Sequence, residues 1–129
     1  MKIQATWDFN VSVTCEFDTF ESTLTQIQGG KEEGTIKGTI QRANGQKTFI
    51  IDNSDLHARL HGVNLGFQFY VTTIKKCFDM GAIEIRSSTT LNEHSIGVWN
   101  KIQRLYYNCS YRGTKRSGYY VVTRSKDIL

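Results

Sequence analysis

Residues 34–52 read GTIKGTIQRANGQKTFIID, and this stretch predicts a β-hairpin. Asn44 and Gly45 form a strong signal for a two-residue turn, because both residue types tolerate the positive φ angles that such turns need. The turn fixes three cross-strand pairs: Ala43 with Gln46, Ile40 with Phe49, and Gly38 with Ile51. The apolar residues then share one face, so the register is self-consistent.

The chain before this hairpin begins with a long alternation. From Lys2 to Phe17, polar and apolar residues alternate, which predicts a strand with one buried and one exposed face. Sixteen residues would extend over about 50 Å, whereas a domain of this size has a radius of gyration near ~14 Å. The strand must therefore coil, bend or pair with a second subunit, and we expect a homodimer.

Residues 19–28, between this strand and the hairpin, predict a helix. Asp18 can cap it, and Glu21 follows at the spacing of a capping box. Apolar residues recur at helical spacing: Phe20, Leu24 and Ile27. The pair of glycines at 29 and 30 would end the helix.

Four further elements follow the hairpin. The patterns predict a short helix over 54–61, a second hairpin over 65–77 and 82–89, a helix over 93–107 capped by Asn92, and a final strand over 118–124. The expected fold is a single α+β domain spanning residues 1–129. Its antiparallel sheet has about six strands, from the long N-terminal strand, two hairpins and a C-terminal strand, with two main helices packed on one face.

Composition and charge narrow the class of protein. The chain has 129 residues, a net charge of +4 and 39% hydrophobic residues, which fits a packed domain. No apolar run is long enough to span a membrane and no secretory signal opens the chain, so we expect a cytoplasmic protein. Three widely spaced cysteines without a C-x-x-C motif indicate neither a disulfide scaffold nor a zinc ribbon.

Charge is distributed unevenly along the chain. Residues 1–33 sum to −4, whereas residues 101–129 sum to +6. The basic end also holds tyrosines, and arginine binds phosphate while a flat aromatic ring can stack on a base. The candidate binding residues are Arg104, Tyr107, Tyr111, Arg112, Lys115, Arg116 and Arg124. We therefore predict a small binding protein for nucleic acid or a phosphorylated, nucleotide-like ligand.

Several alternatives stay open. Some of these tyrosines can belong to the core, and the arginines can neutralise the acidic N-terminal third. A metal-independent ribonuclease needs only groups such as His94 and these cations. A third alternative is a viral or mobile-element accessory protein that blocks a nucleic-acid-handling machine through a protein partner. We expect a binding protein rather than an enzyme, and we assign no catalytic residue.

The histidines do not predict a metal site. His57 and His61 are spaced to share one helical face near Asp55, but no glutamate follows the first histidine as the zinc-protease motif requires. We expect no metal and no cofactor, and the roles of His57, His61 and His94 stay open.

Overall fold

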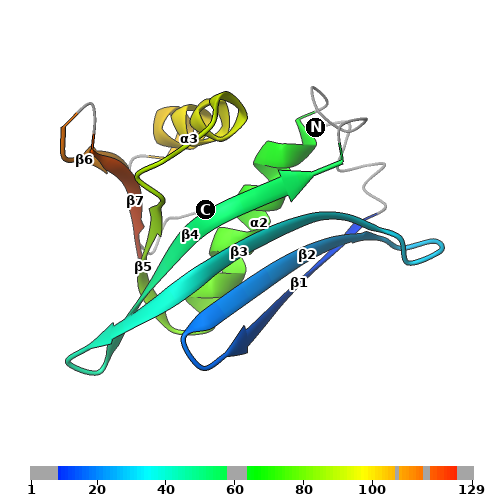
Figure 1. Ribbon diagram of the computed structural model, residues 1–129, viewed down its shortest axis with the longest axis horizontal. Helices are drawn as coiled ribbons and strands as arrows, with labels where there is room; N and C mark the ends of the chain where they lie inside the picture. The colour runs from blue at the N-terminus through cyan, green and yellow to red at the C-terminus, as the bar shows by residue number, and fades with distance from the viewer. Residues whose placement is uncertain (1–8, 58–63, 107, 115–116, 125–129) are drawn as a thin grey trace.

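The computed structural model describes residues 9–57, 64–106, 108–114 and 117–124, which form a mixed seven-stranded sheet and two helices (Figure 1). The strands are β1 (Phe9–Glu16), β2 (Thr19–Gln26), β3 (Glu32–Ala43), β4 (Gln46–Leu56), β5 (Ala82–Ser87), β6 (Cys109–Arg112) and β7 (Tyr119–Thr123). The helices are α2 (Leu65–Asp79) and α3 (Glu93–Leu105). Across the sheet the order is β1-β2-β3-β4-β5-β7-β6. The α+β class is confirmed, but an antiparallel sheet of about six strands is wrong, because there are seven and β4 runs parallel to β5.

The hairpin of β3 and β4 has the predicted register. Ala43 pairs with Gln46, and the other two predicted pairs are also present. Asn44 and Gly45 have φ angles of 54° and 76°, as a two-residue turn with the twist of the strands requires. The local sequence therefore fixes the centre of the sheet.

The predicted helix over 19–28 is wrong, because these residues form β2. Phe20, Ser22 and Leu24 are buried while the residues between them are at least partly exposed, which is the two-residue period of a strand. Phe20 and Leu24 are four residues apart, a spacing that fits either period. The buried Ser22 hydroxyl, 2.8 Å from the Thr73 hydroxyl of α2, breaks the apolar pattern that would have revealed the strand.

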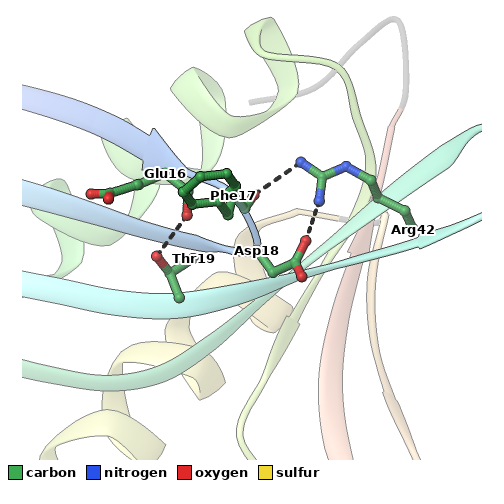
Figure 2. A network of polar contacts seen from close by, with 5 residues as sticks. All are labelled: Glu16, Phe17, Asp18, Thr19 and Arg42. Atoms are coloured by element: carbon green, nitrogen blue, oxygen red, sulfur yellow. Dashed lines mark hydrogen bonds and ion pairs between the residues drawn. The ribbon is translucent and has the colours of Figure 1, made fainter.

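A two-residue turn joins β1 to β2 in place of a helix cap. Phe17 has a φ angle of 53°, which is uncommon for a bulky residue, and its side chain is 86% exposed. Arg42 holds the turn, since its guanidinium donates to the Phe17 carbonyl at 3.0 Å and to the Asp18 carboxylate at 2.5 Å (Figure 2). The predicted N-terminal strand is present over Phe9–Glu16, and its first part lies outside the described residues.

The predicted second hairpin is also wrong in its first half, because residues 65–79 form α2. The residues buried along it recur at helical spacing: Leu65, Phe69, Tyr70, Thr73, Ile74, Cys77 and Phe78. Alternating Phe67, Phe69 and Val71 resemble a strand only over a short window. Parallel strands need a long crossover connection, so α2 is what permits β4 and β5 to pair in parallel.

The C-terminal part is closer to prediction. The helix over 93–107 is confirmed as α3, whose N-cap residue Asn92 accepts a hydrogen bond from the Ser95 amide at 2.8 Å. The last strand is confirmed as β7. β6 was not predicted, because its residues resemble a polar loop. The predicted short helix over 54–61 is wrong in its first part, since residues 54–56 belong to β4, and the rest falls largely outside the described residues.

Both helices share one core with the sheet. Trp99 of α3 is fully buried, with its ring against Tyr70 of α2 and stacked on Tyr120 of β7 at 5.7 Å. In β1–β4, the alternate side chains point away from this core and are exposed or half-buried. We call this the outer face; it includes Ser12, Thr14, Glu21, Thr23, Thr35, Lys37, Asn53 and Asp55. Among the described residues, no helix is long and apolar enough to cross a membrane.

The packing of α2 gives a first prediction. Ile74 is fully buried, so Ile74→Ala should lower the free energy of unfolding by about 2–5 kcal/mol. Ile27 is 65% exposed, so Ile27→Ala should change it by no more than about 0.5 kcal/mol. Urea titration of the two variants measures both effects. An equally small effect of both substitutions would contradict the packing of α2 against the sheet.

Candidate functional site

A cleft of about 490 Å³ lies between α2 and α3. The first turn of α2 supplies one wall, and residues 93–101 of α3 supply the other. The described lining residues are Asn64, Gly66, Phe67, Glu93, His94, Gly97, Val98 and Lys101. This volume is within the usual range for a small-molecule site.

The cleft is electropositive where α2 begins. Asn64 takes a left-handed conformation, with φ at 64°, and its side chain makes no capping hydrogen bond to the helix. The side-chain Oδ1 of Asn64 instead accepts a hydrogen bond from the Lys101 ammonium at 2.6 Å. The Asn64 side chain therefore does not cap the first-turn amides of α2, and helix N-termini attract anions. The Lys101 ammonium, 4.5 Å from the centre of the Phe67 ring, adds a full positive charge.

Two glycines shape the walls of the cleft. A Cβ atom on Gly66 would lie 3.0 Å from Nε2 of His94, so glycine allows α2 and α3 to approach closely. A Cβ atom on Gly97 would meet nothing within 4 Å, although Gly97 lies inside a helix. Glycine in a helix interior lowers helix stability by about 1 kcal/mol relative to alanine. Gly97 therefore leaves open space in the cleft at the expense of the stability of α3.

β4 and β5 diverge beyond the end of their pairing (Figure 1). β4 pairs with β5 from Lys47 to Ile51, where β5 ends at Ser87, whereas β4 continues to Leu56. The register with β3 steps from Gly38–Ile51 to Lys37–Asn53, so Asp52 is an extra residue in β4. Such a β-bulge leaves a backbone group outside the regular ladder and bends the strand. Gly38 is required opposite the bulge, because a Cβ atom there would lie 1.9 Å from the Ile50 carbonyl oxygen.

A chain of hydroxyl groups connects the separated end of β4 to both helices. The hydroxyls of Ser54 and Tyr70 are 2.6 Å apart, and Ser95 of α3 also hydrogen-bonds Tyr70. Burial raises the pKa of Tyr70, and its hydrogen bonds to Ser54 and Ser95 oppose this shift only in part. Tyr70 thus remains a neutral hydrogen-bonding group that fixes the relative positions of β4, α2 and α3.

Among the described residues, the predicted arginines do not form one site. Arg124 donates to the carbonyl oxygens of Phe78 and Ala82, and its guanidinium lies over the Phe78 ring, so it fastens the end of α2 to the sheet. Arg112 forms an ion pair with Glu84 at 3.7 Å.

The remaining candidates are scattered or outside the described residues. Tyr111 packs edge-on against Tyr120, and Arg104 is exposed in the last turn of α3. Tyr107, Lys115 and Arg116 lie outside the described residues. A binding role for these seven residues stays a prediction without structural support as a group.

The histidines and cysteines do not converge on a catalytic or metal centre within the described part of the chain. His94 lines the cleft, His57 follows β4, and His61 is not among the described residues. No group of three metal-ligating side chains occurs among the described residues. All three cysteines are free thiols. Burial raises the pKa of Cys77 to about 12 and that of Cys109 to about 11, so both are protonated at neutral pH.

Comparison with known proteins identifies the fold. No family model and no curated protein matches the sequence. The NatC complex bound to Gag peptide and CoA is similar, with a TM-score of 0.59 and 10% identity over 81% of this chain and 71% of that chain. Naa50 from Arabidopsis thaliana, in complex with the bisubstrate analogue CoA-Ac-MVNAL, gives a TM-score of 0.55 and 16% identity over 81% and 72% of the two chains. A mutant of the toxin AtaT, bound to the C-terminus of the antitoxin AtaR and acetyl-CoA, gives 0.61 and 8% identity over 90% and 93%. At these identities the likeness shows the fold alone, which is that of the GNAT acetyltransferases.

These comparisons overturn the function predicted from the sequence. Several of the similar structures are described as acetyltransferases, and three others contain CoA, acetyl-CoA or a CoA conjugate. The predictions of nucleic-acid binding, of a ribonuclease and of a viral or mobile-element inhibitor are therefore wrong. The excess of basic residues near the C-terminus suggested an anion-binding surface. Two of these residues instead make contacts within the protein, because Arg112 pairs with Glu84 and Arg124 donates to the Ala82 carbonyl.

The sequence analysis also missed the cleft. Residues 65–77 were assigned to a strand, which hid the start of α2 and the anion-attracting amides there. One usable signal was Gly97, a glycine in the middle of a predicted helix without a capping role.

The thiols give a test of this region. Cys15 is exposed, whereas Cys77 and Cys109 are buried with raised pKa values, and alkylation requires an accessible thiolate. At pH 8 the native protein should lose one thiol to iodoacetamide, and mass spectrometry of its peptides should place the label on Cys15. All three thiols should react in denaturant. Rapid native labelling of Cys77 would show that α2 is not packed on the sheet.

Proposed function

We propose that this protein transfers an acetyl group from acetyl-CoA to an amine. The observation that carries the proposal is the N-terminus of α2, which the Asn64 side chain does not cap and which faces a cleft beside Lys101. The proteins of similar fold with bound CoA, acetyl-CoA or a CoA conjugate support this substrate class.

The residues of the cleft fit the parts of a CoA molecule. The diphosphate would bind the first-turn amides of α2, since helix N-termini are ready-made phosphate sites. The Lys101 ammonium would neutralise a second phosphate charge. Phe67, Val98 and the open space beside Gly97 would accommodate the less polar pantetheine arm. The positive charge at the start of α2 and at Lys101, together with the open space beside Gly97, favours CoA as the ligand, and the Glu93 carboxylate also lines the cleft.

The chemistry needs little from the protein beyond placement. The lone pair of a neutral amine attacks the thioester carbonyl carbon, the carbon–sulfur bond breaks, and CoA leaves with the proton that the amine releases. A backbone N–H at the Asp52 bulge, outside the regular ladder, is suited to stabilise the negative charge that develops on the carbonyl oxygen. The hydroxyl chain through Tyr70 would hold β4 and the helices in the separated arrangement.

A protein partner remains part of the proposal. Two of the similar structures contain a bound peptide or antitoxin segment, which is compatible with such a partner here. The homodimer expected from the sequence stays a prediction. Its structural basis would be β1, which lies at the edge of the sheet and offers an unpaired strand side.

Calorimetric titration with CoA tests the proposed function. The protein should bind CoA, and Lys101→Met should weaken binding about tenfold by removing a charge-assisted contact. Gly97→Leu should weaken it at least as much, because the new side chain fills the cleft, while thermal stability is retained.

Gln103→Leu is the matched control, since Gln103 is exposed on the same helix and does not line the cleft. This variant should bind CoA like the parent. Acetyl transfer is then followed by release of the CoA thiol when amines are added to protein and acetyl-CoA. A parent protein that binds neither CoA nor acetyl-CoA would contradict the proposal. Equal affinities for all variants would place the site elsewhere.

A further inference from the structure

A second hollow lies on the outer face of the sheet, at the bulge in β4. It has a volume of about 310 Å³. Its lining residues come from four neighbouring strands and are Thr14, Glu16, Thr19, Phe20, Glu21, Lys37, Gly38, Thr39, Asp52 and Asn53. We call it the outer groove. The strand register places Thr14, Glu21, Lys37 and Asn53 in one row across it.

The position of the outer groove relates it to the cleft. Asp52 and Asn53 line the groove, and they directly follow Ile51, the last residue of β4 that pairs with β5. The cleft is built by α2 and α3, which pack on the core side of the sheet. The two hollows therefore lie on opposite faces of the sheet. An acetyl group that reaches the separation of β4 and β5 from the helix side would meet an acceptor held on the outer side.

The lining of the outer groove specifies the kind of acceptor. Three carboxylates, from Glu16, Glu21 and Asp52, face a single cation, Lys37, and the threonines add hydroxyl groups. Asp52 is already oriented, because its Oδ2 accepts a hydrogen bond from the Thr39 hydroxyl at 3.2 Å. Carboxylates and hydroxyls bind ammonium groups and hydrogen-bond donors. Most of the lining side chains are polar or charged, so a hydrophilic amine has more partners here than an apolar one.

The turn between β1 and β2 supplies an aromatic edge beside this groove. Glu16 and Thr19 line the groove and flank the turn, and the Thr19 hydroxyl donates to the Glu16 carbonyl at 3.0 Å (Figure 2). Phe17 projects from the turn with 86% of its surface exposed. The face of an aromatic ring attracts cations, so Phe17 suits an alkylammonium chain that extends from the groove.

We propose that the acceptor is a hydrophilic polyamine, held in the outer groove by Asp52, Glu21 and Glu16, with Phe17 contacting the part of the chain that extends beyond it. This inference rests on the proposed acetyl transfer. One protonated nitrogen would bind the carboxylates while a second, neutral nitrogen approaches the thioester. The acceptor amine then becomes an amide, and the carboxylates act as positioning residues that hold the rest of the molecule.

Spermidine is the probe, and benzylamine is the apolar comparison. We expect acetyl transfer to spermidine with kcat/KM at least tenfold above that for benzylamine. Asp52→Asn and Glu21→Gln should each raise KM for spermidine about tenfold and leave CoA affinity unchanged. Asparagine retains an oxygen that can accept from Thr39, so the bulge is preserved. Glu32→Gln removes an exposed carboxylate outside the groove and should leave KM for spermidine unchanged.

The outcomes separate this inference from the proposed function. If CoA binds and transfer favours benzylamine, or if KM for spermidine is the same in parent and Asp52→Asn, the outer groove is not the acceptor site while acetyl transfer stands. Calorimetric titration of spermidine without CoA gives an independent readout. Binding that Asp52→Asn and Glu21→Gln weaken, and Glu32→Gln does not, supports the groove even if CoA fails to bind. Absence of spermidine binding both with and without CoA overturns the inference.

Discussion

The parallel pairing of β4 with β5 is the constraint on which the rest of the structure depends. Two consecutive parallel strands cannot be joined by a tight turn, so the chain must cross over through α2. This crossover starts α2 near the end of β4 and covers the core side of the sheet. Because the pairing stops at Ile51 while β4 continues to Leu56, the same constraint leaves the strands separated where the helix begins. The start of this crossover helix then forms one wall of the cleft, and α3 forms the other.

The sequence predicts those elements whose signals are local. The turn at Asn44 and Gly45 needs only two residues to specify it, and Asn92 caps α3 through its own side chain. The elements that were assigned wrongly depend on distant contacts. Ser22 is buried in β2 because Thr73 of α2 offers it a hydrogen bond, and no local pattern contains that information. Residues 65–77 carry apolar side chains at both two-residue and four-residue spacings, and only the need to connect parallel strands decides between them.

The candidate site was harder to predict than the fold, for an electrostatic reason. The sequence shows formal charges, and it therefore directed attention to the arginines of the C-terminal third. Arg124 donates hydrogen bonds to the carbonyl oxygens of Phe78 and Ala82. Arg112 forms an ion pair with Glu84. Part of the positive charge at the cleft comes from backbone amides at a helix terminus, which the formal charges of the sequence do not show. Lys101 matters because α3 places it beside that terminus, a relation that exists only in the folded chain.

The outer face shows how one sequence pattern can serve two purposes. In β1 and β2, alternate residues such as Val11 and Leu24 fill the core, and the residues between them form the exposed rows. Because a two-residue turn joins β1 to β2, these rows stay accessible, and side chains of the strands themselves must supply any contact to a ligand there. Moving one strand by a single residue would exchange Glu21 with its buried neighbours and destroy core and groove together. The register that stabilises the sheet is thus also the register that sets which side chains face an acceptor, so selection on either one constrains the other.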